Sequence, residues 1–173
     1  MKKMSLIFVL FLGQYAYAQN RTAELRQELI EAYEMSEKYT LTICEQMPAE
    51  HYTYKTVDSV MTFTEQFRHC VVYTLNQISG RTGVKNPNEG RKLPVQMPKE
   101  QLIKEVKAMY AFVKMTIAEL PEAKLYEKTG FTGGEIPMWR LFYAMENHII
   151  HHRGQCIMYM RDKGVKPQGY FGW

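Results

Sequence analysis

The sequence predicts an all-α protein built as a four-helix bundle, and three observations support this prediction. Four long segments carry apolar residues at every third or fourth position, which is the period of an amphipathic helix. Pro and Gly gather between these segments, and no segment alternates polar and apolar residues as a strand does. The length of 173 residues and the hydrophobic fraction of 46 % fit a single globular domain.

The first two predicted helices cover residues of about 21–46 and about 57–79. The first contains no Pro or Gly and carries apolar side chains along one face. The second is expected to begin near Asp58 or Ser59, which are good capping residues, and to stop at Gly80.

The third and fourth predicted helices cover residues of about 99–119 and about 136–163. The third is expected to stop before Pro121. The fourth begins near Pro137, a residue that suits the first turn of a helix, and ends at Gly164.

The lengths of the connections predict the topology. The first connection has roughly ten residues, whereas the second, about 80–97, is nearly twice as long and exceeds the usual link between helices. A long second connection allows the third helix to run parallel to the second, so we expect an up-down-down-up bundle with a crossover between helices 2 and 3. The Gly-rich segment 121–135 is expected to be a loop.

Residues 1–18 have the pattern of a cleaved secretory signal peptide. Lys2 and Lys3 provide the positive start, an apolar run covers residues 6–12, and residues 16–18 (AYA) match a cleavage site. The apolar run is too short to span a bilayer alone, so no membrane span is expected after cleavage. An uncleaved anchor is the alternative interpretation.

Cleavage after Ala18 leaves Gln19 as the first residue of a bundle domain covering 19–173, exported to the periplasm or secreted. The formal charge of +4 then falls by the two leader lysines to about +2. Such a small surplus does not indicate a nucleic-acid surface, so we expect no nucleic-acid partner. The three cysteines, Cys44, Cys70 and Cys156, are too few for a disulfide scaffold, and we expect buried thiols.

Three histidines form a candidate metal site. His148 and His152 are four residues apart, so both lie on one face of the fourth helix and can bind one ion. His151 points about 100° away from His152 and is the poorer ligand. His69, in the second helix among apolar residues, can supply the third ligand. The alternative is a surface pair of histidines and a hydrogen-bonded core histidine.

These residues belong to motifs that resemble the DinB-like superfamily. The motifs are residues 147–155 (NHIIHHRGQ), residues 63–69 (FTEQFRH) and the C-terminal segment 164–170. The resemblance covers essentially the whole chain after the leader. It implies an up-down-down-up four-helix bundle whose three-histidine metal site falls on His69, His148 and His152. It also implies thiol S-transferase or thiol-dependent isomerase activity in some relatives, and frequent dimers, so a homodimer is possible.

Three neutral imidazoles leave coordination positions open on a divalent transition metal, of which zinc is the default and nickel or iron the alternatives. We therefore expect an enzyme of the hydrolase or thiol S-transferase type that acts on a small-molecule substrate. Glu65, one turn before His69, is the candidate catalytic base, Gln66 a candidate hydrogen-bond partner, and Cys156 a candidate fourth ligand. The alternative function is a non-catalytic metal-bundle protein that binds a small molecule or a partner.

Overall fold

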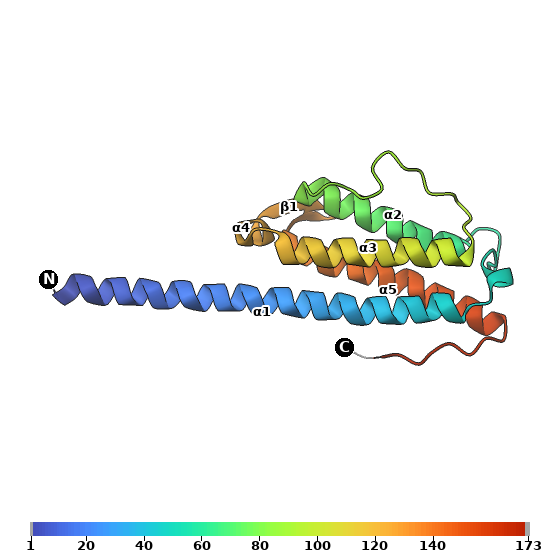
Figure 1. Cartoon of the computed structure of the whole chain (residues 1–173), viewed down its shortest axis with the longest axis horizontal. Coiled ribbons are helices and arrows are strands. Elements are labelled where there is room, and N and C mark those ends of the chain that lie inside the picture. Colours follow the sequence, from blue (N-terminus) through green and yellow to red (C-terminus); the bar gives the residue numbers. More distant parts are fainter. Residues whose placement is uncertain (1, 172–173) are drawn as a thin grey trace.

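The computed structural model describes the backbone of residues 2–171 and the side chains of residues 21–171. Four long helices form the bundle shown in Figure 1: α1 (Lys2–Gln46), α2 (Phe63–Thr82), α3 (Lys99–Glu119) and α5 (Met138–Asp162). The short elements are the 3-10 helix η1 (Ala49–His51), the helix α4 (Glu122–Tyr126), and an antiparallel hairpin of β1 (Lys128–Phe131) and β2 (Gly134–Pro137). The predicted all-α four-helix fold is confirmed.

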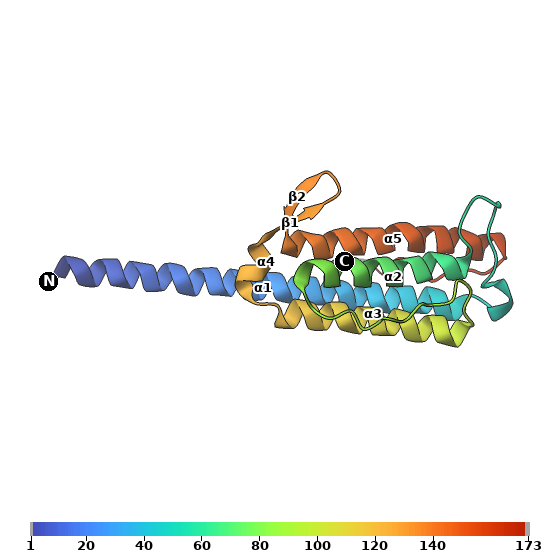
Figure 2. The same ribbon diagram turned by 90° about the horizontal axis from the view of Figure 1, so that it is seen from above.

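The helices are arranged as two parallel pairs. Figures 1 and 2 show α1 and α5 running in one direction and α2 and α3 in the other, which is an up-down-down-up order. The connection from α2 to α3 runs back along the length of the bundle. Helices α2 and α5 pack side by side, and each also contacts the long helix that runs parallel to it, α3 and α1 respectively. The interface between α2 and α5 is the one that carries the three histidines.

The first helix is longer than predicted, whereas the third and fourth long helices begin and end within two residues of the predicted bounds. Helix α1 begins at Lys2 and ends at Gln46. The predicted signal peptide, residues 1–18, lies outside the residues whose side chains the structure describes. Within the described part of the chain, no helix combines the length and the apolar character that crossing a membrane requires.

Both ends of α2 differ from the prediction. The helix begins at Phe63, not near Asp58 or Ser59, because Thr62 is the N-cap. The Thr62 hydroxyl accepts from the Glu65 N–H at 3.3 Å, and the Glu65 carboxylate accepts from the Thr62 N–H at 2.8 Å. This reciprocal capping box satisfies two backbone donors that the first turn would otherwise leave free.

The C-terminal end of α2 lies three residues beyond the predicted stop. The helix passes through Gly80 and ends at Thr82, and Gly83 caps it with a left-handed φ of 78°. Its N–H donates to the carbonyl of Ser79 at 3.0 Å. The positive φ explains why the glycine at 83, and not the one at 80, ends the helix.

The segment predicted to be one loop, 121–135, contains α4 and most of the hairpin. The strands pair from Lys128 opposite Pro137 to Phe131 opposite Gly134, and Gly133 in the turn has a φ of 91°. The loop prediction is therefore wrong for this segment. Strands of four residues are too short to show a reliable alternation of polar and apolar side chains.

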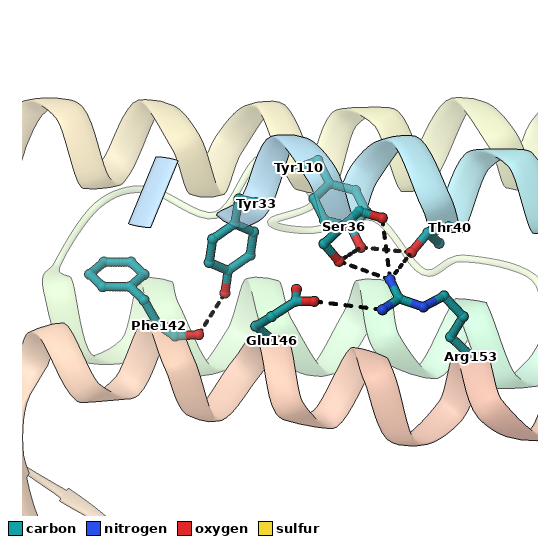
Figure 3. Close-up of polar contacts among 7 residues, drawn as sticks. All are labelled: Tyr33, Ser36, Thr40, Tyr110, Phe142, Glu146 and Arg153. Carbon is teal, nitrogen blue, oxygen red and sulfur yellow. Dashed lines mark hydrogen bonds and ion pairs between the residues drawn. The ribbon is translucent and has the colours of Figure 1, made fainter. Parts of the chain in front are cut away.

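A polar network lies in the otherwise apolar centre of the bundle, as Figure 3 shows. Arg153 of α5 donates through Nη1 to the hydroxyls of Ser36 and Thr40 on α1, at 3.0 Å each. Its Nη2 lies 4.0 Å from Oε1 of Glu146, two turns earlier on α5. The Tyr110 hydroxyl of α3 joins both α1 hydroxyls. The network thereby fixes α5 against α1 and α3.

Candidate metal centre

The structure brings His69 of α2 together with His148 and His152 of α5. The Nε2 atom of His148 lies 3.1 Å from Nε2 of His69 and 3.1 Å from Nε2 of His152. One ligand nitrogen from each of the three residues lies within 4.8 Å of the other two. His152 is buried, while His69 and His148 are partly exposed. The cluster is therefore partly open to solvent.

The spacing of these nitrogens fits a metal ion. Two imidazole nitrogens bound tetrahedrally to one zinc ion, each at 2.0–2.1 Å, are separated by about 3.3 Å. The two separations of 3.1 Å are close to this value. The Nε2 atom of His148 carries at most one hydrogen, so it cannot donate to both neighbours, and the buried Nδ1 of the same ring has no hydrogen-bond partner among the described residues. A cation between the three rings would engage all three Nε2 atoms at once.

Gln66 sets the tautomer of His152. Its Oε1 atom is in short contact with Nδ1 of His152, and an amide oxygen only accepts, so Nδ1 carries the hydrogen. The Gln66 orientation is held in turn, because its Nε2 donates to Oε1 of Gln155 at 2.7 Å and to the Tyr159 hydroxyl at 3.1 Å. Nε2 of His152 is therefore left unprotonated and directed at the cluster, as a ligand must be. The hydrogen-bonding role predicted for Gln66 is confirmed.

The environment keeps the three rings neutral. Burial lowers the pKa of His148 to about 4, with further lowering from the neighbouring His69 and His151. Burial is also the largest cause that lowers the pKa of His152 to about 3. The pKa of His69 is lowered by burial and then by the charge of Arg68. Neutral imidazole is the form that binds metals, so the cluster is prepared for a cation at neutral pH.

The ring of Tyr73 borders the cluster. This residue lies one turn after His69 on α2, and its ring centroid is 5.6 Å from that of His69 and 4.5 Å from that of His148. The motifs of the sequence did not indicate Tyr73. Its position four residues after His69 places it on the same face of the helix, and this spacing is visible in the sequence.

His151 lies outside the cluster. Its side chain is exposed, and its Nε2 lies 3.0 Å from Nε2 of Gln155. Cys156 is fully buried, and its Sγ lies 3.9 Å from the Phe63 carbonyl oxygen. Burial raises the pKa of this thiol, which opposes the thiolate form that binds metals. All three cysteines are free and buried, as predicted.

The carboxylate of Glu65 is engaged at the N-terminus of α2. It accepts from the Thr62 N–H within the capping box, and the side chain is partly exposed. Its suggested role as a catalytic base stays a prediction.

Comparisons with known proteins agree with this fold. The profile of the DinB family matches residues 18–171. A DinB-like protein from Bacillus cereus ATCC 10987 superposes with a TM-score of 0.72 at 22 % identity, covering 84 % of this chain and 97 % of that one. The DinB-like protein YjoA from Bacillus subtilis superposes with a TM-score of 0.67 at 18 % identity, covering 83 % of this chain and 97 % of that one.

A sequence relative is known over part of the chain. The uncharacterized protein YrdA of Bacillus subtilis strain 168 is 32 % identical over 65 residues, which are 38 % of this chain and 39 % of YrdA. The chain thus matches well under half of the length of that relative. The family profile, in contrast, covers nearly all of the sequence and includes His69, His148 and His152. The chain belongs to the DinB family.

Proposed function

We propose that this protein is an exported metal-dependent enzyme that acts on a small molecule, by hydrolysis or by transfer to a thiol. The observation that carries the proposal is the convergence of three neutral imidazoles, from His69, His148 and His152, on one partly exposed point. Zinc is the ion we expect, and nickel or iron(II) would also suit three imidazoles. Bound there, the ion would keep an open coordination position, at which it lowers the pKa of water or of a thiol.

The residues around the cluster have separate tasks in this proposal. Gln66 orients His152 through Nδ1, so that Nε2 is directed at the ion. Tyr73 forms an aromatic wall beside His69 and His148 and restricts the direction from which a substrate can approach. Together they favour a single orientation of the substrate's reacting group.

An activity comparison tests the enzymatic part of the proposal. Metal-loaded protein, His69→Ala and His151→Ala are assayed for ester hydrolysis and for transfer of an electrophile to a small thiol. We expect one of the two reactions to proceed with the wild type and with His151→Ala, and to be lost with His69→Ala. Equal rates for His69→Ala and the wild type would show that the histidine cluster is not the site of the reaction.

The alternative, a non-catalytic metal-bundle protein, is favoured by one observation. Glu65, the base predicted from the sequence, is held by the N-cap of α2. Glu65→Gln tests the catalytic role of Glu65, because glutamine preserves a capping box but cannot accept a proton. A loss of turnover with unchanged stability would support catalysis by Glu65, and unchanged turnover would exclude it.

Export is proposed from the leader sequence. Lys2 and Lys3, the apolar run 6–12 and the small residues at 16–18 support cleavage before Gln19. Mass spectrometry of the protein from its native host is expected to find Gln19 as the first residue. Recovery of the intact N-terminus from the cytoplasm would contradict export.

A further inference from the structure

A pocket of about 470 Å³ lies between the β1–β2 hairpin and the first half of α5. The hairpin side contributes Phe131 and Ile136, and the helix side contributes Arg140, Tyr143, Ala144 and Asn147. Figure 2 shows the hairpin standing beside the N-terminal part of α5. A volume of this size is typical of sites that hold a small organic molecule.

The pocket is next to the histidine cluster. Ala144 precedes His148 by four residues on α5, which places it on the same face at a distance of one turn, about 6 Å along the axis. Helix α2 runs antiparallel to α5, so Tyr73, which follows His69, lies on the side of the cluster that faces the hairpin. A molecule in the pocket therefore has its nearest end beside His148.

Contacts from other elements hold the pocket walls in place. Arg81 at the end of α2 donates through Nε to the Gly130 carbonyl at 2.8 Å, and its guanidinium lies 5.7 Å from the centre of the Phe131 ring. The Tyr143 hydroxyl donates to the Glu28 carboxylate of α1 at 2.9 Å. The hairpin and the helix face are thus fixed before any ligand enters, which lowers the entropic cost of binding.

The polar groups of the pocket indicate the charge of its ligand. Arg140 lines the pocket, is exposed, and has no hydrogen bond or ion pair within the described residues. Glu135 on the hairpin carries the opposite charge, which disfavours an anion there and directs it to Arg140. Phe131, Ile136 and Ala144 supply apolar surface in the same pocket.

We propose that this pocket binds the body of the substrate, with an anionic end on Arg140 and the reacting group at the three histidines. The inference rests on the proposed metal-dependent function and specifies its substrate class. Arg140 precedes His148 by eight residues, about 12 Å along the helix axis, and the arginine side chain spans part of this distance. The substrate is accordingly a partly apolar carboxylate whose charged and reacting ends are roughly 10 Å apart.

Thiols of different length and charge test this assignment. The cobalt(II)-loaded protein is titrated with 6-mercaptohexanoate, 6-mercaptohexanol and mercaptoacetate, and thiol binding is followed by the sulfur-to-cobalt absorption band. We expect 6-mercaptohexanoate to bind about tenfold more tightly than the uncharged 6-mercaptohexanol, because it adds one charge-assisted contact. Mercaptoacetate is too short to reach both ends and gains nothing from its carboxylate.

Two variants test whether Arg140 causes the preference for 6-mercaptohexanoate over 6-mercaptohexanol. Arg140→Gln is expected to bring the affinities of the two long thiols together, whereas Arg161→Gln, a matched exposed position in the last turn of α5, retains the preference. Equal affinities in the wild type, or a preference that survives Arg140→Gln, would overturn the proposal.

A measurement without metal distinguishes failure of the pocket from failure of the metal site. If the wild type binds no cobalt, the proposed function fails, and the pocket is tested with hexanoate by amide NMR. Hexanoate, and not hexanol, is expected to shift the signals of Phe131, Ala144 and Asn147 in the wild type but not in Arg140→Gln. Absence of these shifts in the wild type would overturn the assignment of the pocket independently of the metal.

Discussion

The Nε2 atom of His152 is directed at the other two histidines because Gln66 holds Nδ1 on the opposite side of the ring. Gln66 is itself fixed by Gln155 and Tyr159, so three side chains determine the orientation of one ligand. Groups that orient a metal ligand in this way are commonly worth 10–100-fold in metal affinity.

Gln66→Ala is therefore expected to weaken metal binding by about 10–100-fold, as measured by competition with a chelator. Gln77→Ala is the matched control, since Gln77 lies on the same helix and its buried Oε1 has no hydrogen-bond partner among the described residues. Equal affinities for the two variants would show that the contact with Gln66 does not orient His152.

Metal affinity is expected to fall less between pH 7 and pH 5 than it would at a site of three ordinary histidines. Protons compete with the ion only below the pKa of each ligand; the pKa values of His148 and His152 are lowered to about 4 and about 3, and the pKa of His69 is lowered as well. At a site of ordinary histidines with a pKa of about 6.5, protonation of each ligand would lower the metal affinity by about 30-fold at pH 5. Chelator competition at the two pH values measures the difference, and a steep loss with a midpoint near 6.5 would contradict the burial of the site.

Much of the site could be predicted from the sequence at this scale. The spacing of His148 and His152 on one helix face, together with His69, indicated the cluster that the structure contains. The pattern T-x-x-E at residues 62–65 was equally visible, but its meaning depended on where α2 begins. With a helix start expected near residue 57, this pattern did not indicate a cap, and the catalytic role suggested for Glu65 stays a prediction beside its capping contact.

At the scale of single elements, the two glycines near the end of α2 have opposite roles. Gly80 is helical and exposed, and a Cβ built there would have no atom within 4 Å. Gly83 adopts a φ of 78°, which other residues rarely adopt. Sequence alone could not distinguish them, because either residue can end a helix, and only the tertiary position of the chain selects one.

Gly80→Ala is expected to raise the free energy of unfolding by about 1 kcal/mol, since alanine has the better helix propensity and meets no obstruction. Gly83→Ala is expected to lower it by about 1 kcal/mol or more, because its left-handed φ is strained for alanine. Chemical denaturation of the two variants measures both changes. Stabilisation by Gly83→Ala would contradict the assigned helix end.

The hairpin was the element that the sequence did not reveal. Its strands have four residues each, and contacts with other elements, such as Arg81 on Gly130 and Phe131, hold it beside α5. Interactions of this kind join residues about fifty positions apart. Local sequence patterns do not predict such long-range contacts, so the hairpin and the pocket beside it could not be predicted from the sequence.

For the bundle as a whole, the carboxyl group of Glu146 is a buried ionisable group in the centre. Glu146 is only 2 % exposed, and neither carboxylate oxygen has a hydrogen bond within the described part of the chain (Figure 3). Burial raises the pKa of Glu146 to about 7, and the charge of Arg153 opposes this rise. The ionised form is thus less favourable in the folded protein than in the unfolded chain.

The stability of the protein is expected to depend on the protonation of Glu146. A carboxyl group whose pKa is raised on folding contributes most stability below its unfolded value of 4.5, and this contribution is lost as the pH rises through about 7. Glu146→Gln is expected to remove the contribution, so the stability of the variant relative to the wild type is greater at pH 8 than at pH 5. Denaturant titrations at both pH values measure the difference in the free energy of unfolding between the variant and the wild type. The same difference at pH 5 and pH 8 would mean that Glu146 titrates as an exposed group.

The central claim is that His69, His148 and His152 hold one metal ion. Elemental analysis of untagged protein purified from its native compartment tests it most directly, beside His69→Ala, His148→Ala, His152→Ala and the control His151→Ala. We expect about one equivalent of a transition metal in the wild type and in His151→Ala, and none in the three other variants. Absence of metal from the wild type even after reconstitution, or its loss on His151→Ala alone, would contradict the claim.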